Sequence, residues 1–438
     1  MKFLGSQIGA REHYAVPRAL HQQGKLAGLV TDWYAFGRQN RKQKVESRNK
    51  VPISDFRISA LRNVCRLWSV VCRPVVPRSA LASRAEGIPD DLVRAFPFRS
   101  LLWKWRVRRL TAQKRSHEAY VQTDAAFAAA VARLKLPPHE VFFGYSYASL
   151  EMLEVEKKRG VLTVLDQIDP GAVELQLVAE EMARFPELAG PPPEFPAAYY
   201  ERNRREWALA DVIVVNSEWS REALLKQGVA PEKLVVVPLA FEANAEKLTA
   251  ENRNEFQVSD FSISAFSPLR VLWLGQVNVR KGIHYLMEAA RKLEREKVHF
   301  DVVGPIGILP GAVASAPRNM TFHGPVNRDD AAEWYRKADV FVLPTLSDGF
   351  AITQLEAMSH GLPVITTPCC GEVVSDGVDG FIVPPRDTDA LAKTFLHYLS
   401  EPDLLQEQRK AALEKSKQFT LEHLAAKLLS LESSLLNR

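Results

Sequence analysis

The 438-residue sequence has little cysteine and no long hydrophobic run. Its 4 cysteines, Cys65, Cys72, Cys369 and Cys370, show neither the spacing nor the histidine partners of a zinc site, so we expect reduced thiols that bind no metal. No window approaches the roughly eighteen apolar residues of a membrane-spanning helix. The first residues also lack the long apolar core of a signal peptide. These absences predict a cytoplasmic protein.

Positive charge is concentrated at the start of the chain. The net charge of +5 conceals 24 Lys and Arg against 8 Asp and Glu in residues 1–120, a balance of +16. Much of the excess lies in residues 57–78 and 99–115, where Trp68, Trp103 and Trp105 lie among the cations. Such stretches suit an anionic membrane surface, and a solvated helix with a buried aromatic side is the alternative. Because no nucleic-acid-binding motif accompanies the charge, we expect no nucleic-acid partner.

The second half of the chain alternates short apolar runs with segments of helical periodicity. Continuous β-branched runs are typical of strands buried on both faces, and the intervening segments carry apolar residues at three-to-four spacing. The predicted strands are 271–274, 298–303, 340–344, 363–366 and 381–383, and the predicted helices are 283–295, 329–336, 352–359 and 387–399. This order predicts a parallel sheet covered by helices on both faces.

The first half repeats this pattern less regularly. Its predicted strands are a short first strand before Gly5, then 26–31, 140–143, 162–165, 211–215 and 234–237. Since the chain is too long for one ordinary core, we expect two α/β domains, at 1–241 and 269–420, joined by a polar linker at 242–268. The final segment, 421–438, contains a Leu-rich amphipathic helix that we expect to pack back on the first domain.

Two turns carry the residues that suggest chemistry. After the strand ending at Pro344, the turn with Asp348 and Gly349 leads into a helix whose free N–H groups suit a phosphate. Asp348 and Glu356 can face one ligand from this turn and helix. An N-cap aspartate with a surface glutamate is the alternative.

The second turn, residues 275–282, follows strand 271–274 and ends in Arg280 and Lys281. Lys281 can neutralise a diphosphate, and Arg280 can bind phosphate oxygens through two N–H groups. A solvated basic loop is the alternative. Both turns follow parallel strands, and open parallel sheets bind ligands at the carboxyl ends of their strands.

These motifs in this order resemble the retaining GT-B glycosyltransferases of family 4, the glycosyl transferases group 1. The family pattern GRxxxxKG is similar to residues 275–282, EGFGxxxLEAMxxGxPVI to residues 348–365, and GExVxDGxxGxxVPPxD to residues 371–387. The resemblance continues weakly in residues 210–217 and in the turn from Gly5 to Gly9.

The resemblance implies a GT-B fold, in which two Rossmann-like domains with parallel sheets face an interdomain cleft. Residues 1–241 would form the acceptor side, and residues 269–420 would bind the donor. The implied reaction transfers a sugar from a UDP-, GDP- or ADP-sugar to the hydroxyl of a glycan or lipid-linked acceptor, with retention of configuration. Such a hexosyltransferase would serve polysaccharide, lipopolysaccharide or glycolipid biosynthesis, without a metal or other cofactor.

The resemblance also implies roles for individual residues. Lys281 would contact the donor diphosphate, Glu356 the ribose, and Asp348 the transferred sugar, with Arg280 as a further catalytic cation. The expected donor-binding residues are Gly275, Gln276, Lys281, Gly349, Phe350, Ala351, Ile352 and Glu356.

Two positions depart from the family pattern. Gln276 stands where the family has arginine, and Leu165 stands where it has a histidine near the acceptor. The acceptor-side candidates are therefore Gly9, Asp166, Gln167 and Asp169, and a structural turn is the alternative for the last three. A non-catalytic nucleotide-sugar binding protein and a nucleotide-sugar epimerase are alternative functions.

Two further motifs are interpreted as structural. Asp387-Thr388-Asp389 looks like a metal-binding DxD sequence, but it stands where a helix N-cap is expected. His323 is expected in a loop after a strand, near the base of a nucleotide or in a purely structural role.

Overall fold

The computed structural model describes the chain except for residues 10–13, 35–86, 114, 193–194, 243–267 and 437–438. Cys65, Cys72, Trp68, the basic run 57–78 and nearly all of the predicted linker therefore lie outside the described residues. Contacts divide the chain into two compact units. One contains residues 1–164 and 201–209, and the other contains residues 165–200 and 210–438.

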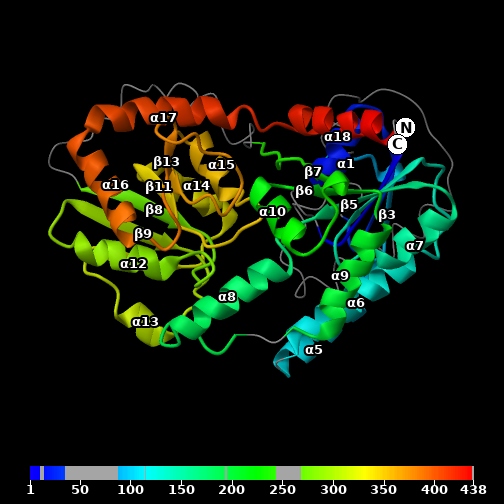
Figure 1. Cartoon of the computed structure of the whole chain (residues 1–438), viewed down its shortest axis with the longest axis horizontal. Helices are drawn as coiled ribbons and strands as arrows, with labels where there is room; N and C mark the ends of the chain where they lie inside the picture. The colour runs from blue at the N-terminus through cyan, green and yellow to red at the C-terminus, as the bar shows by residue number, and fades with distance from the viewer. Residues whose placement is uncertain (10–13, 35–86, 114, 193–194, 243–267, 437–438) are drawn as a thin grey trace, which may run out of the picture. The chain divides into compact units, whose positions relative to one another are not determined.

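The first of two sheets has seven strands in the order β3-β2-β1-β4-β5-β6-β7 (Figure 1). The strands are β1 (Phe3–Gln7), β2 (Leu26–Thr31), β3 (Val93–Ala95), β4 (Val141–Tyr145), β5 (Leu162–Gln167), β6 (Val212–Val215) and β7 (Leu234–Val236). All the strands predicted in this half are present, and β3 is additional. Strand β3 escapes prediction because it has only three residues, of which Arg94 is exposed.

The helices of this half fill the connections between its strands. They are α1 (Ala15–Gln22), α5 (Pro97–Ala112), α6 (Ser116–Val131), α7 (Leu150–Lys158), α8 (Ala172–Arg184), α9 (Ala197–Leu209) and α10 (Glu218–Lys226), with 3-10 turns η2 (Asp90–Leu92) and η3 (Pro231–Lys233).

The second sheet has six parallel strands in the order β10-β9-β8-β11-β12-β13. The strands are β8 (Leu269–Leu274), β9 (Val298–Val303), β10 (Met320–Gly324), β11 (Val340–Leu343), β12 (Val364–Thr366) and β13 (Gly380–Ile382). The five predicted strands are confirmed, and β10 is additional. It lies at the sheet edge with only Met320 buried, so it lacks the continuous apolar run of a central strand. His323 therefore lies within this strand, and its expected position in a loop is wrong.

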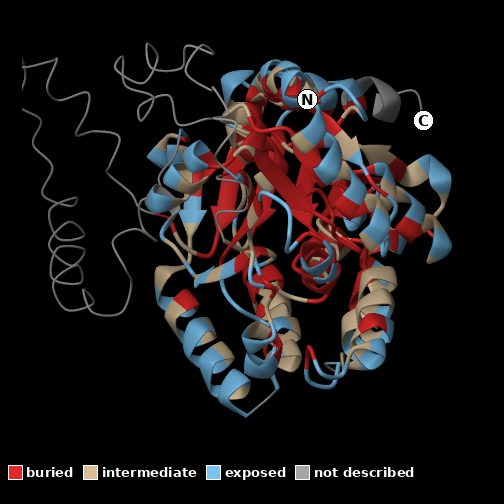
Figure 2. Cartoon of the chain, turned by 90° about the vertical axis from the view of Figure 1, so that its left-hand side faces the viewer, coloured by how far each residue is buried: buried red, intermediate tan, exposed pale blue. Residues whose placement is uncertain are grey.

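Most residues in the central strands of the second sheet are buried (Figure 2), and their side chains alternate between two apolar clusters. Val271 and Trp273 pack in one apolar cluster with helices α12 and α16, whereas Leu272 and Phe341 pack in another with α14, α15 and α17. The helices are α12 (Ile283–Lys292), α13 (Pro310–Ala314), α14 (Arg328–Lys337), α15 (Thr353–Ser359), α16 (Thr388–Ser400), α17 (Pro402–Ser416) and α18 (Leu421–Leu436). This two-sided burial explains the near-continuous apolar strands. Helix α18 is where it was predicted.

Helix α8 lies between β5 and β6 in the chain but belongs to the unit that contains the second sheet. Its buried Glu181 accepts hydrogen bonds from the Tyr285 hydroxyl and from His284 Nε2 (3.1 Å), and it pairs with Arg386 (2.9 Å). Burial alone would raise the pKa of Glu181, but these hydrogen bonds and the Arg386 charge lower it to about 2. Glu181 thus fastens α8 to α12 and to the loop before α16.

Candidate active site

The candidate site lies at the topological switch point of the second sheet. The chain runs outward from β8 through β9 to β10, and then resumes on the other side of β8 with β11. Connections on either side of such a point leave in opposite directions, which opens a crevice at the carboxyl ends of the two strands. The turn 275–282 follows β8, and residues 344–349 follow β11. The two turns identified from the sequence therefore both lie at this switch point.

Backbone contacts hold these two turns together. Leu346 N–H donates to the Arg280 carbonyl (2.9 Å), and the Thr345 hydroxyl donates to the same oxygen (3.3 Å). Gly282 has φ 76°, and a Cβ there would collide with the carbonyl of Pro344. Only glycine can take this conformation so close to another backbone. The glycine after Lys281 is therefore required for the two turns to approach.

The three predicted catalytic residues form one charge cluster. Lys281 Nζ pairs with the Asp348 carboxylate, and Arg280 Nη1 lies 3.8 Å from Asp348 Oδ1 and donates to the Ser347 carbonyl (3.0 Å). The side chains of Lys281 and Asp348 are only 12% and 16% exposed. Asp348 does not cap α15, whose N-cap is Ile352 without a side-chain hydrogen bond. The solvated-loop and N-cap alternatives therefore do not describe these residues.

Burial changes the protonation of Lys281. Desolvation, together with the adjacent charge of Arg280, lowers the pKa of Lys281 from 10.5 to about 7. An amine with this pKa changes between its charged and neutral forms near neutral pH. A bound anion would favour the charged form and raise the pKa again.

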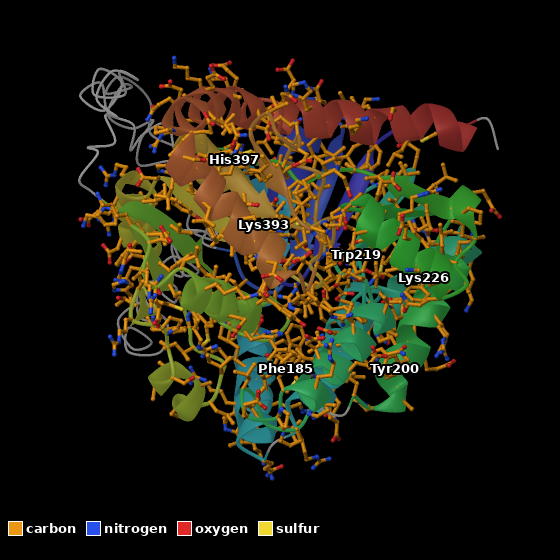
Figure 3. All side chains as sticks on the ribbon, turned by 60° about the vertical axis from the view of Figure 1, so that its left-hand side comes forward. Phe185, Tyr200, Trp219, Lys226, Lys393 and His397 are labelled. Atoms are coloured by element: carbon orange, nitrogen blue, oxygen red, sulfur yellow. The ribbon has the colours of Figure 1, made fainter. Side chains whose placement is uncertain are left out.

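Glu174 of α8 also reaches this cluster, and sequence reasoning missed it. Its Oε2 accepts a hydrogen bond from Ser347 Oγ (2.8 Å) and lies 3.4 Å from Arg280 Nη1. Trp219 Nε1 of α10, labelled in Figure 3, donates to the same Ser347 hydroxyl (3.0 Å). Burial raises the pKa of Glu174, against the opposing effect of Arg280. No motif marks Glu174, because only folding brings α8 to the turn at Arg280.

The residues after Asp348 contribute backbone rather than side chains. A Cβ on Gly349 would lie 2.7 Å from the Asn216 amide and 2.8 Å from the Ile168 carbonyl, so a larger residue does not fit. The Phe350 ring is buried in the apolar cluster beside Phe419. Ala351 has φ 57°, a left-handed conformation that disfavours residues with a Cβ, and the family pattern has glycine there.

Glu356 is held by a tyrosine. Its Oε2 accepts a hydrogen bond from the Tyr335 hydroxyl (2.9 Å), and the Tyr335 ring stacks on His360 at a centroid distance of 5.1 Å. Glu356 is partly buried, so it is not an exposed surface glutamate. The Tyr335 hydroxyl therefore orients the Glu356 carboxylate from α14.

Gln276 lies in the same turn as Arg280 and Lys281. It is exposed, and its Oε1 is 3.5 Å from Asn278 Nδ2 on the same turn. Gly275 has φ 153°, and its N–H bonds the Val303 carbonyl (3.0 Å). Gly275 thus shapes the turn, while Arg280 and Lys281 supply its positive charge within the cluster.

The acceptor-side candidates lie in two places. In the first unit, Gly9 N–H donates to Asp32 Oδ1 (2.8 Å) after β1. Asp166 and Gln167 are buried at the end of β5, and Asp169 Oδ1 accepts from Gln167 Nε2 (3.0 Å) and from Gly171 N–H (2.9 Å). For Gln167 and Asp169, these bonds correspond to the structural-turn alternative. Leu165 is fully buried.

The two secondary motifs have structural contacts. Asp387 Oδ1 accepts from Ala390 N–H (2.8 Å), which confirms the predicted N-cap of α16, and Asp389 pairs with Lys292 (2.7 Å). His323 Nε2 lies 2.8 Å from Asp301 Oδ1.

The described residues provide no group of three or more His, Cys, Asp or Glu arranged to hold a metal ion. None of the helices described is long and apolar enough to cross a bilayer. Cys369 and Cys370 are buried free thiols, and burial raises the pKa of Cys370 to about 11.

Comparisons with known proteins agree with this fold. Sucrose-phosphate synthase of Thermosynechococcus elongatus superposes with a TM-score of 0.58 at 18% identity, over 100% of both chains. HepE of Anabaena in complex with UDP superposes with a TM-score of 0.54 at 14% identity, over 99% of this chain and 100% of that one. The two parallel sheets and these superpositions define a GT-B fold.

The family model matches the part of the chain that forms the second sheet. Residues 268–401 match the family model for glycosyl transferases group 1. The D-inositol 3-phosphate glycosyltransferase of Streptomyces griseus subsp. griseus is 32% identical over 102 residues, 23% of this chain and 22% of the relative. The chain spans about half or less of the length of the curated relatives it matches. These similarities support a glycosyltransferase.

Proposed function

We propose that this protein is a metal-independent, retaining hexosyltransferase that moves a sugar from a nucleotide-sugar to an acceptor hydroxyl. The observation that carries the proposal is the cluster of Arg280, Lys281 and Asp348 at the switch point of a sheet that matches the group 1 model. Two cations and a carboxylate there suit a diphosphate attached to a sugar. Anabaena HepE has been solved with UDP, which makes a nucleoside diphosphate the first ligand to test.

The proposed mechanism needs no covalent nucleophile. Lys281 and Arg280 stabilise negative charge on the departing diphosphate, and Asp348 faces the sugar as it gains positive charge. The leaving phosphate takes the proton of the acceptor hydroxyl on the same face of the sugar, which retains the configuration. Exclusion of water from the site would keep water from replacing the acceptor.

A donor screen followed by product analysis tests this function. UDP-, GDP- and ADP-sugars are screened by thermal shift, because a ligand at 100 times its dissociation constant stabilises the fold by about 2.7 kcal/mol. Sugar transfer to glycan or lipid-linked acceptors, with the anomeric configuration determined by NMR, would support the proposal. Binding without transfer or hydrolysis would favour a non-catalytic binding protein, and an epimerised donor without acceptor would favour an epimerase. An inverted product would refute retention.

We also propose that this transfer takes place at the cytoplasmic face of an anionic membrane, in polysaccharide, lipopolysaccharide or glycolipid synthesis. The surface that supports this proposal is the exposed side of α5, where the side chains of Leu102 and Trp105 are 67% and 60% exposed. On the opposite side of α5, Trp103 packs edge-on against Phe127 at 6.0 Å. The helix therefore has apolar residues on two opposite sides. Among the described residues, α6 covers the side with Trp103, and the side with Leu102 and Trp105 remains largely exposed.

The charges of α5 complement an anionic surface. The helix carries Arg99, Lys104, Arg106, Arg108 and Arg109 and no acidic residue. The Arg109 guanidinium lies over the Trp105 ring at 5.5 Å. Exposed aromatic residues flanked by cations are typical of interfacial helices.

Liposome co-sedimentation tests the membrane proposal. The protein should bind vesicles that contain phosphatidylglycerol, and binding should weaken with salt. Charge reversal at Lys104, Arg106, Arg108 and Arg109, or Trp105→Ser with Leu102→Ser, should release it. Val378→Ser is the control, because Val378 is 58% exposed in the other unit. If both α5 variants sediment with the vesicles like the parent, the membrane proposal is refuted and α5 is a solvated helix.

A further inference from the structure

Glu174 occupies a position that neither the family pattern nor the switch-point rule explains. It stands near the start of α8, and its side chain is only 15% exposed. The hydrogen bond from Ser347 Oγ fixes its carboxylate oxygen, and Trp219 fixes Ser347 in turn. Hydrogen bonds therefore hold Glu174 in place within the cluster, unlike a flexible carboxylate on the surface.

The contacts of Glu174 place it against the cations proposed to bind the donor diphosphate. Arg280 Nη1 lies 3.4 Å from Glu174 and 3.8 Å from Asp348, so the two carboxylates approach one guanidinium group. Lys281 pairs with Asp348 as well. When Lys281 is protonated, two carboxylates thus balance two cations before any donor binds.

A diphosphate that binds Arg280 brings further negative charge close to the Glu174 carboxylate. Like charges a few ångströms apart repel strongly when water is largely excluded. Asp348 is expected to face the sugar and to be useful when the sugar becomes positively charged. Glu174 lies against Arg280, so its direct effect is to oppose the anion there, although its charge also favours the protonated form of Lys281.

We propose that Glu174 is an internal counter-ion of the diphosphate site, which holds Arg280 in the donor-free protein and weakens the binding of nucleoside diphosphates. This inference rests on the proposed function and deepens it, because a counter-ion that competes with the diphosphate speeds release of the nucleotide product. Protonation of Glu174 would remove the competition. Burial already raises its pKa, so this occurs more readily than for an exposed glutamate.

The alternative is that Glu174 only anchors α8. In that case its replacement would lower the stability of the fold without strengthening anion binding. The two roles therefore predict different changes in measured affinity.

Isothermal titration with inorganic pyrophosphate and with UDP, at one pH near 7.5, tests the proposal. Glu174→Gln keeps the size of the side chain and should bind both probes about tenfold more tightly, equivalent to about 1.4 kcal/mol. The matched control is Glu180→Gln, an exposed residue of the same helix that bonds Gln176, and it should bind like the parent. In an Arg280→Gln background, the gain from Glu174→Gln should largely disappear, because the two residues act on each other.

Equal or weaker pyrophosphate binding by folded Glu174→Gln would overturn the proposal. If that variant does not fold, Glu174→Asp provides the test. Its shorter side chain places the carboxylate farther from Arg280, so this variant should also bind pyrophosphate and UDP more tightly. Unchanged affinity of that variant would then be contrary evidence. A tenfold gain for pyrophosphate without any binding of UDP would support the counter-ion and reject the nucleotide donor. Absence of pyrophosphate binding in parent and variants alike would reject the cation site and this inference with it.

Discussion

Lys281 should make donor binding depend on pH near neutrality. In the donor-free protein its pKa is lowered to about 7 by burial and by Arg280. A diphosphate in contact with the amine favours the ammonium form, so donor binding should be accompanied by proton uptake. Affinity should therefore be highest below pH 7 and fall as the pH rises.

The size of this effect follows from the two protonation states. If only the charged amine binds, the protonated fraction of the donor-free site sets the apparent affinity. With a pKa of about 7, this fraction falls about tenfold between pH 6 and pH 8 and about tenfold again by pH 9. The decline stops where the pH reaches the pKa of the bound state. The same shift has a second consequence. The donor-free fold should gain stability as the pH rises from about 7 towards 10.5, because the unfolded chain still holds the proton.

The assay is titration calorimetry with a UDP-sugar found in the donor screen, at pH 6, 7, 8 and 9. A nucleotide-sugar is preferable to UDP because its diphosphate does not titrate in this range. Lys281→Arg is the matched control, since a guanidinium stays charged throughout and should give a nearly flat profile. Lys281→Met should bind weakly and also without pH dependence.

Two results would refute this reasoning. A flat affinity of the parent from pH 6 to 9 would mean that Lys281 remains fully charged, held by Asp348. An equal decline in Lys281→Arg would assign the titration to another group. Glu174→Gln should retain the decline and begin it at lower pH, because the Glu174 charge favours the protonated form of Lys281.

Three further predictions concern other parts of the site. Glu356→Gln should raise KM roughly 10- to 100-fold, equal to about 1.5–3 kcal/mol for a charged hydrogen bond, whereas Asp348→Asn should mainly lower kcat; steady-state kinetics that match the parent for both would reject the site. Ala351→Gly should stabilise the fold by about 0.5–1 kcal/mol, because relief of the left-handed strain exceeds the entropy lost by glycine, and a lower melting temperature would contradict this. Transfer should survive EDTA, and activity abolished by chelation and restored by magnesium or manganese would show a metal requirement.

The parallel sheet and its two turns follow from local features of the sequence. Strands such as β8 and β11 are buried on both faces, so almost every residue is apolar and the runs stand out. The turn glycines are recognisable because other residues cannot take their conformations or fit their surroundings, as for Gly282 and Gly349. The rules of parallel sheets then place both turns at the carboxyl edge of the sheet, whereas the strand order itself comes from the structure.

Local patterns fail where an element is short or half exposed. Strand β10 lies at the edge of its sheet and alternates exposed residues with buried or half-buried ones, and β3 has only three residues. A single sequence does not distinguish such segments from loops, because packing against neighbouring strands determines whether the segment forms a strand.

The composition of the charge cluster was decided only by tertiary structure. The sequence indicated Arg280, Lys281 and Asp348 because they lie in turns with a recognisable pattern. It gave no indication of Glu174, which lies 106 residues from Arg280 and reaches it only because α8 packs in the same unit as the second sheet. The burial that lowers the pKa of Lys281 likewise depends on everything packed around it. Residue type and spacing determine which groups can bind a diphosphate, whereas their partners, exposure and protonation depend on contacts between distant parts of the chain.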